Sequence, residues 1–558
     1  MSATNPFSTV DISVLPRSFH HLSQSNRTTL GYGYLYPVFA LDLMPGATIK
    51  VGATSILKAQ PMVAPSMTPQ NLYLHSFFVP YRLVDRNFTK GVIGCDEKGT
   101  RYDYQFPIWN PPSADQIVGS LWDYFGLPIN VQYGGESAFQ VLNTNCKGVE
   151  PTVYLKRAYN LIYNEWFRDE NLVDEVDLDS ELLQKRAWKK DYFTACLSSQ
   201  QKPNDVGSYA SLPVNTILSE SQNAFNLFNS KNVSGGSVSC SGLSFYNTPE
   251  TIYRNASDSG MFLDVTGSQS STVQSYPFSS FSSVSESGRL VASLNPNWLS
   301  ATSTAFDVSD MRLAFQLQKY YEKNARGGTR YVEWLKMHFH SDIHDDTLQI
   351  PEFVGGTKVP ILVNDIFQTS QTSQNAPLGT RGGVGNSILG DYIGKWSARE
   401  HGVFIVLASV LPRAEYMQGV NRMWIKHDNL DWYKPEFCML SEREVYRGEL
   451  VCSSSSDDSV AEQYNKSLFG YQEMYNEYRY LPDITTGHMR TVFNYWHQTR
   501  NFDPSVENNF NREFIECDPS MRTFASYTED PFMCMFNFDV KAYLPMTYRG
   551  TPGFIDHF

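Results

Sequence analysis

The alternation of apolar and polar residues predicts strands near both ends of the chain, with helices between them. Leu30–Met44 alternates small and aromatic residues and is followed by a Pro45-Gly46 turn signal. The other segments with a strand pattern are Ala47–Ala59, Asn71–Leu83, Gly402–Met417 and Pro531–Tyr548. Strands that are punctuated by Pro and Gly and come from distant parts of the chain are typical of a jelly roll. We therefore expect a mainly β protein.

Helical periodicity occurs in two blocks between these strands. Tyr154–Leu172 repeats apolar residues at helical spacing, and Glu181–Cys196 also looks helical. In the second block Asp307 is the expected N-cap of a helix that ends at Gly327-Gly328, and Arg330–His340 starts another helix. One face of the long helix is expected to carry Leu313, Leu317 and Tyr321. The two blocks predict helical insertions in the β fold.

A segment of different composition lies between the helical blocks. Residues 221–304 contain 22 serines among 84 residues and only 7 charged residues, yet aromatic residues are spread through them. A flexible linker lacks such aromatics, so we expect a folded surface insertion that several subunits build together into an outward protrusion. The aromatic residues expected to serve this protrusion are Phe245, Tyr246, Tyr276, Phe278 and Phe281.

The expected organisation of the chain follows from this segment. Residues 1–220 would hold the N-terminal jelly-roll strands and a helical insertion, and residues 221–304 the serine-rich surface protrusion. Residues 305–558 would hold a helical segment and the C-terminal jelly-roll strands.

The composition of the chain limits the classes of protein to which it can belong. Charged residues make up 18% of the chain and aromatic residues 14%, which suits wide subunit contacts and, almost as well, a carbohydrate-handling β protein. The net charge is -13, and residues 1–30 contain only Arg17 and Arg27, so a separate basic partner or cations would have to neutralise an enclosed nucleic acid. Eight scattered cysteines without a CxxC pair indicate reduced thiols. No signal peptide or membrane-spanning run is recognisable.

Nine stretches, spread over nearly the whole chain outside the serine-rich segment, carry a distinctive combined pattern. The most specific are Arg157–Leu172 (RAYNLIYNEWFRDENL) and Ala314–Tyr331 (AFQLQKYYEKNARGGTRY). The others are Tyr73–Arg82, Asp191–Leu197, Gln349–Gly356, Gln368–Ser370, Pro377–Gly379, Phe469–Tyr480 and Pro552–Phe558. In order and separation they resemble the major capsid protein of gokushoviruses, within the microvirus family (Microviridae).

The resemblance implies an eight-stranded antiparallel jelly roll of the viral capsid type, with helical insertions and the serine-rich segment as a protrusion at three-fold axes. It implies a structural bacteriophage protein that assembles with itself into a small icosahedral T=1 shell around circular single-stranded DNA and binds a host cell-surface receptor. The implied partners are a pilot protein, an internal scaffolding protein and a small basic DNA-binding protein. The protein would reside in the virion capsid, and in the host bacterial cytoplasm during assembly. No enzyme activity, cofactor or membrane insertion is implied.

The densest group of possible metal ligands lies just after the second helical block. His338, His340 and Asp342 would project to one side of an extended segment, whereas His340 and His344 would share one face of a helix. A polar helix end followed by a surface loop explains the same residues without a metal. We favour that second interpretation.

No pattern predicts a catalytic site. Gly379–Gly385 lacks the Lys-Ser/Thr ending of a nucleotide-binding loop, and the acidic run Asp174–Glu181 lies on a polar connection where charges are usually solvated. Basic and aromatic residues alternate in Lys319–Arg330 and Tyr475–Tyr480, which favours subunit contacts over DNA stacking. The sequence does not identify the DNA-contacting residues.

Two further expectations can be tested against the structure and in solution. The alternative function is a jelly-roll protein that binds or cleaves carbohydrate, which would be monomeric or dimeric and would need two opposed acids across a cleft. Trp166 is expected to be a packing residue of the common scaffold. If its ring is buried, Trp166→Ala should cost about 3–5 kcal/mol of stability.

Overall fold

The structure is a computed structural model that describes residues 17–95, 98, 100–112, 115–129, 148–202, 238–239, 277–278, 308–327, 331–339, 344–367, 369, 379, 381–438, 442–527 and 529–549. The chain divides into two compact units, residues 205–318 and the larger unit formed by residues 1–204 and 319–558. Within the smaller unit, β6 (Val238–Ser239) pairs with β7 (Pro277–Phe278) in antiparallel fashion.

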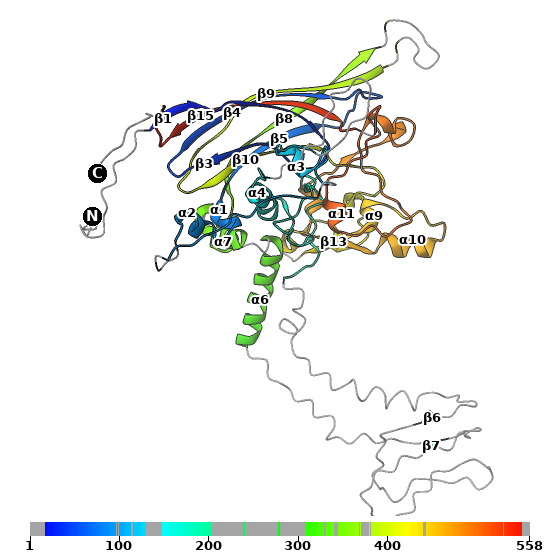
Figure 1. Cartoon of the computed structure of the whole chain (residues 1–558). Coiled ribbons are helices and arrows are strands. Elements are labelled where there is room, and N and C mark those ends of the chain that lie inside the picture. Colours follow the sequence, from blue (N-terminus) through cyan, green and yellow to red (C-terminus); the bar gives the residue numbers. More distant parts are fainter. Residues whose placement is uncertain are drawn as a thin grey trace, which may run out of the picture. The chain divides into compact units, whose positions relative to one another are not determined.

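Nine strands form the main sheet system of the larger unit (Figure 1). They are β1 (Ser18–His21), β2 (Gln24–Leu30), β3 (Tyr36–Leu43), β4 (Thr48–Ala59), β5 (Gln70–Pro80), β8 (Glu352–Phe367), β9 (Arg381–Ser397), β10 (Gly402–Pro412) and β15 (Phe532–Leu544). Short pairs outside this system join β11 (Glu415–Tyr416) to β14 (Asp483–Ile484), and β12 (Arg443–Tyr446) to β13 (Leu468–Gln472).

The described helices are mostly short. They are α1 (Tyr81–Val84), α2 (Phe88–Ile93), α3 (Leu121–Tyr124), α4 (Tyr154–Ile162), α6 (Val308–Gly327), α7 (Tyr331–Phe339), α8 (Asp345–Leu348), α9 (Arg447–Leu450), α10 (Asp458–Asn465) and α11 (Arg512–Ile515). A π-helical turn, Tyr163–Phe167, continues α4. Single 3-10 turns span Arg422–Trp424, Asn429–Asp431, Pro435–Phe437, Asn476–Tyr478, Gly487–Arg490 and Asn494–Trp496.

The strand order is that of a jelly roll. β1 and β2 lie along β15 in one continuous register, from Ser18 opposite Leu544 to Leu30 opposite Phe532, so together they act as one interrupted strand. The nine strands therefore make eight rows in two antiparallel layers. The first layer is β1/β2–β15–β4–β9 and the second is β3–β10–β5–β8, joined by pairing of β8 with β9. The predicted eight-stranded antiparallel jelly roll is confirmed.

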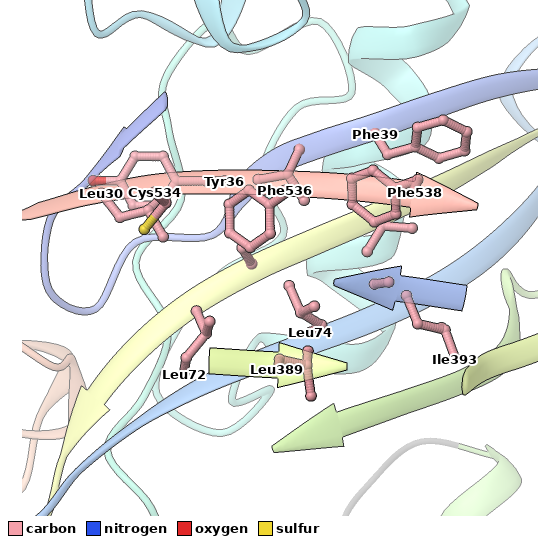
Figure 2. Packing of buried hydrophobic residues seen from close by; sticks show 14 of the residues in the cluster. Leu30, Tyr36, Phe39, Leu72, Leu74, Leu389, Ile393, Cys534, Phe536 and Phe538 are labelled. Atoms are coloured by element: carbon pink, nitrogen blue, oxygen red, sulfur yellow. The ribbon is translucent and has the colours of Figure 1, made fainter. Parts of the chain in front are cut away.

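Alternating side chains from the two layers meet in one hydrophobic core (Figure 2). In β15 every second residue from Phe532 to Ala542 is buried, because successive side chains of a strand point to opposite faces. Phe538 of β15 contacts Phe39 of β3, with 4.7 Å between the ring centroids. Leu72 and Leu74 of β5 belong to the same core. The alternating pattern of the sequence thus places these residues between the layers.

The second layer is also covered on its outer face. All eleven residues of β10 are buried, which requires packing on both sides of the strand. The outward residues of the layer contact a second apolar cluster that includes Trp122 of α3 and Ala158, Tyr159 and Ile162 of α4. The Tyr159 hydroxyl donates to the Leu35 carbonyl at 2.8 Å, which ties α4 to the segment before β3. The helical insertion therefore covers the outer face of this layer, and we call its helices α3 and α4 the helical lid.

The helices in part follow the predicted pattern. The expected helix over Tyr154–Leu172 is present to Phe167, and the long helix ends at Gly327 as expected. Asp307, its predicted N-cap, lies outside the described residues. The expected apolar face is only partial, because Leu313 is 58% exposed. The helix expected from Arg330 is α7, which begins at Tyr331.

The helix predicted over Glu181–Cys196 is wrong. This segment is an irregular, partly buried connection whose backbone bonds reach distant parts of the chain. The Gln184 carbonyl accepts from the Leu35 amide at 3.0 Å, and the Trp188 amide donates to the Ile515 carbonyl at 2.8 Å. These tertiary bonds replace the i to i−4 bonds of a helix, so packing overrides local propensity here.

Two smaller expectations concern Trp166 and the cysteines. The Trp166 side chain is 38% exposed, so the condition of a buried ring is not met, although its indole N–H donates to the Pro351 carbonyl at 2.9 Å. The six cysteines within the described residues are free thiols, and Cys146 and Cys240 lie outside them. Among the described helices, none is both long enough and apolar enough to cross a membrane.

Candidate assembly surface

The outer face of the first layer is open to solvent, and we call it the open face. It consists of the exposed alternate positions of β1, β2, β15, β4 and β9. Strand register places these side chains in rows across the layer, such as Phe19, Tyr543, Thr48 and Ser397 in one row. Further along the same two strands, β4 and β9, Ile56 lies opposite Ile388, which is 75% exposed. Such a mixed apolar and charged surface is suited to a partner.

A second candidate surface surrounds a cavity of about 240 Å³ in the larger unit, which we call the aromatic-rimmed pocket. Its lining comes from residues 192–193, 416–424, 449 and 477–490. Trp424 is 80% exposed and Ile484 70% exposed, and both line the pocket. Exposed apolar side chains around a hollow are typical of a protein–protein contact, where a neighbour's side chain fills the hollow.

The floor of this pocket is polar and tightly bonded. Arg422 Nη1 lies 2.8 Å from Glu449 Oε1, with both side chains nearly fully buried. The Tyr192 hydroxyl donates to Glu449 Oε2 at 2.9 Å, and the Tyr446 amide donates to Oε1 at 2.9 Å. Burial raises the pKa of Glu449, while Arg422 and these donors act against the increase. The floor is therefore a fixed ionic anchor beneath an apolar rim.

Aromatic and basic side chains continue this surface beyond the pocket. Lys426 Nζ lies 5.0 Å from the ring centroid of Trp432 and 4.1 Å from that of Tyr478. Trp432 is 58% exposed and Tyr433 51% exposed. These residues lie on short 3-10 turns and loops, so packing within a sheet does not explain their aromatic side chains. Their exposure in the single subunit favours a role in contacts between subunits.

The predicted metal ligands are only partly described. His338 lies in α7, where its Nε2 is 2.8 Å from Asn324 Oδ1, and His344 is the exposed residue that precedes α8. Burial, followed by the nearby charge of Lys323, lowers the pKa of His338. His340 and Asp342 lie outside the described residues. Within the described part of the chain, no three His, Cys, Asp or Glu side chains form a group that could hold a metal.

The acidic run Asp174–Glu181 is bound more tightly than we expected. Arg157 of α4 forms two bonds of 2.9 Å to the Asp179 carboxylate, and Lys156 lies 3.5 Å from Glu181 Oε1. Hydrogen bonding to Arg157 lowers the pKa of Asp179. The expectation of freely solvated charges is therefore wrong for these two carboxylates. They hold the connection against α4 instead of facing each other across a cleft.

The basic and aromatic stretches also make contacts within the subunit. In Lys319–Arg330, Arg326 is paired with Glu442, whose side chain is almost fully buried. In Tyr475–Tyr480, the buried Tyr475 donates to the carbonyls of Leu430 and Trp432. Much of this pattern is thus internal packing.

Within the glycine-rich stretch Gly379–Gly385, β9 begins at Arg381. A Cβ atom on Gly383 would lie 2.7 Å from the Pro65 Cα, so the close approach of two backbones explains that glycine.

Most of the residues predicted for the protrusion lie outside the described residues. These are Phe245, Tyr246, Tyr276 and Phe281. Of Phe278, in β7, only the backbone is described.

The jelly-roll fold and the exposed apolar surfaces are typical of a subunit of a larger assembly, and comparison with known proteins identifies the family of the chain. Residues 8–554 match the family described as "Capsid protein (F protein)". The chain is 30% identical to capsid protein VP1 of Chlamydia phage 1, over 98% of this chain and 97% of that protein. It is 28% identical to VP1 of Bdellovibrio phage phiMH2K, over 97% and 96%, and 26% identical to VP1 of Spiroplasma virus 4, over 97% and 95%. The chain belongs to this family of microvirus capsid proteins, which are structural, so the resemblance to gokushovirus capsid proteins is confirmed.

Neither candidate surface was predicted from the sequence. The pocket joins segments that are more than 200 residues apart, such as Tyr192 and Trp424, and only the fold brings them together. A partial signal was present for the open face, because Lys50 and Lys58 of β4 and Lys541 of β15 fall at positions that alternate with apolar residues. That alternation shows which residues face outward but not which of them are neighbours.

Proposed function

We propose that this chain is the major capsid protein of a small phage and assembles with itself into an icosahedral T=1 shell around circular single-stranded DNA. The observation that carries this proposal is the aromatic-rimmed pocket, whose exposed Trp424 and Ile484 would be costly to leave in water. A tryptophan that fills a partner's cavity contributes about 2 kcal/mol or more to a contact. In a closed shell the same contact is repeated by every subunit, so a modest gain per contact stabilises the whole particle.

The central experiment compares assembly with subunit stability. The double variant Trp424→Ala with Ile484→Ser should keep the unfolding midpoint of the subunit but give no particles in the megadalton range on a sizing column. Leu182→Ser is the matched control, because Leu182 is 73% exposed and does not line the pocket. Normal particles from the double variant would exclude the pocket from assembly.

The same column tests the shell itself. A wild-type chain that elutes only as a monomer or dimer under all assembly conditions would contradict the capsid proposal and match the carbohydrate-handling alternative. We also expect no hydrolytic activity toward saccharides. A cleaving activity that co-purifies with the chain and is lost on changing one carboxylate would contradict this.

Attachment to the host is proposed for residues 221–304. Their low charge and scattered aromatics support a protrusion that copies build together, because each copy alone would expose those rings to water. Replacing the segment by a short Gly/Ser linker should leave shells intact and abolish attachment. Full attachment by such shells would remove the binding role.

Three further partners are proposed for the assembling shell in the host cytoplasm: an internal scaffolding protein, a pilot protein and a small basic DNA-binding protein. The net charge of -13 supports the last of these, because the chain as a whole repels DNA. Particles isolated from infected cells should contain a small basic protein in proportion to their DNA. Filled particles without any such protein would contradict this partner.

A further inference from the structure

A row of basic side chains crosses the open face. Lys541 of β15, Lys50 of β4 and Lys395 of β9 are direct neighbours in the strand register, and His21 of β1 lies opposite Lys541 at the end of the row. All four residues are exposed. Neighbouring strands are about 4.8 Å apart, so the three lysines form a compact line of positive charge.

This arrangement is unfavourable in the isolated subunit. Like charges directly opposite each other on neighbouring strands destabilise a sheet. Lys541 has a partial partner, since its Nζ lies 3.8 Å from Asp539 Oδ2. Within the described residues, neither Lys50 nor Lys395 forms an ion pair. An anionic partner would remove the repulsion.

The charge of the whole open layer favours the same conclusion. Its strands β1, β2, β4, β9 and β15 hold six Lys or Arg residues and two Asp residues, and all eight are exposed. The layer therefore has a balance of +4 in a chain whose net charge is -13. The strands of the second layer hold one Lys and three acidic residues. Positive charge is thus concentrated on the face that none of the described residues of the larger unit covers.

Aromatic rings flank the row on both sides. The neighbouring row contains Phe19 and Tyr543, which are 47% and 45% exposed. On the other side Tyr392 is 49% exposed, and Lys50 Nζ lies 5.1 Å from its ring centroid. Surfaces that bind single-stranded nucleic acid without sequence preference combine two features. They have positive charges along the path of the phosphate backbone and aromatic rings on which the bases stack.

We propose that Lys541, Lys50 and Lys395 bind the phosphates of single-stranded DNA, with Tyr392 and Tyr543 as stacking surfaces for its bases. The open face is then the inner face of the shell. An acidic protein segment would use the lysines but would not need two exposed rings beside them, so DNA fits the surface better. This inference rests on the proposed shell function and identifies where that shell contacts its genome.

The test measures binding of the unassembled full-length chain to a fluorescent oligothymidylate by anisotropy at several salt concentrations. The triple variant Lys50→Gln, Lys395→Gln and Lys541→Gln should lower the slope of log K against log salt by about 2, or roughly a hundredfold in affinity between 1 M and 0.1 M salt. The matched control Lys189→Gln, Lys358→Gln and Lys466→Gln removes the same charge from positions off the open face and should change the slope little. Replacing the three row lysines by Arg should restore the slope.

The aromatic part of the proposal has its own measurement. Tyr392→Ala should weaken oligothymidylate binding without changing the salt slope and should leave binding of inorganic polyphosphate unchanged. An equal slope for the triple variant and wild type would overturn the proposal, as would row-dependent binding of polyglutamate without binding of DNA. Particle formation by each variant is followed separately on the sizing column. Normal particles combined with an unchanged slope would overturn the lysine row alone, whereas absence of particles from wild type would overturn the shell function.

Discussion

The two layers of the jelly roll share one core but differ on their outer faces. The second layer is covered by α3 and α4, and β10 within it has no exposed residue. The first layer is covered on its inner side only, so β15 alternates between buried and exposed residues along its length. The first layer also carries the excess of positive charge.

This difference separates two tasks that a shell subunit has to perform. The covered layer and its helical lid bury apolar surface on both sides and thereby supply much of the stability of the subunit. The open layer keeps one face available, and its register determines which charges stand together. Changes to the outer face of the covered layer should therefore destabilise the subunit, whereas changes to the open face should alter what it binds.

The largest expected effect compares one residue type on the two outer faces. Ile405 of β10 is fully buried under the helical lid, whereas Ile56 of β4 is 40% exposed on the open face. Ile405→Ala should reduce the free energy of unfolding by about 3 kcal/mol, and Ile56→Ala by less than about 1 kcal/mol. Chemical unfolding of the unassembled chain measures both. Equal losses would show that the open face contributes to stability as much as the covered one.

The next largest effect is a loss of subunit stability at acid pH, which is caused by a histidine in the covered layer. Burial, and secondarily the charge of Arg186, lowers the pKa of His75 in β5 from 6.5 to about 4. The unfolded chain takes up this proton near pH 6.5 and the folded chain only near pH 4, so the contribution is complete above 6.5 and is lost as the pH falls toward 4. At pH 5 the loss should be about 2 kcal/mol.

The measurement compares unfolding midpoints at pH 7.5 and pH 5 in wild type and in His75→Phe. The ring of His75 contacts Tyr73, Phe167 and Phe353, and its Nδ1 has no hydrogen-bond partner among the described residues, so Phe can replace it. The variant should lose about 2 kcal/mol less than wild type on acidification. Identical losses in both proteins would assign the acid sensitivity to other groups.

Trp166 should give a smaller effect than the range expected for a buried ring. The side chain packs on Phe77 and Phe353 at centroid distances of 5.6 and 5.7 Å, but more than a third of it is exposed. Trp166→Ala should cost about 2 kcal/mol, below the range for buried aromatic residues. Trp166→Phe is the control that keeps an aromatic ring beside Phe77 and Phe353 and loses the bond to Pro351 with part of the indole. A cost of 4 kcal/mol or more in Trp166→Ala would mean that the exposed edge is covered in the folded subunit.

The smallest effect, with the opposite sign, belongs to the open face. Lys50 stands between Lys541 and Lys395, so Lys50→Gln should stabilise the unassembled subunit by about 0.5 kcal/mol at low salt. The gain should disappear in 1 M salt, where the charges are screened. Lys58→Gln, on the same strand and face but outside the row, should be neutral. A loss of stability in Lys50→Gln would contradict repulsion within the row.

The sequence predicted those parts of the fold that depend on local pattern. The alternation in Ala47–Ala59 and Pro531–Tyr548 located β4 and β15, and helical spacing located α4. It failed at Glu181–Cys196, where bonds to Leu35 and Ile515 decide the conformation. Local pattern cannot reveal such bonds, because their partners lie far away in the chain.

The candidate sites were less predictable for the same reason. Lys50, Lys395 and Lys541 are unremarkable as single exposed residues of three strands, and only the register makes them neighbours. The rim of the pocket likewise joins Trp424 and Ile484 from separate loops. The family, in contrast, could be identified from the sequence, because motifs in a matching order do not depend on knowing which residues are in contact.

The pairing of β2 with β15 also determines when the sheet can form during synthesis of the chain. Ser25 of β2 bonds to Asn537 of β15 across 512 residues of sequence. At roughly 5–20 residues per second, a ribosome needs on the order of 25–100 s to make that stretch, and β2 has no strand partner in the sheet until it is finished. The middle of the first layer, and with it the full line of lysines, exists only in a chain that has been read through to β15. An interrupted chain lacks Lys541 and the strand pairing that places it beside Lys50, so it lacks the complete DNA site that we propose.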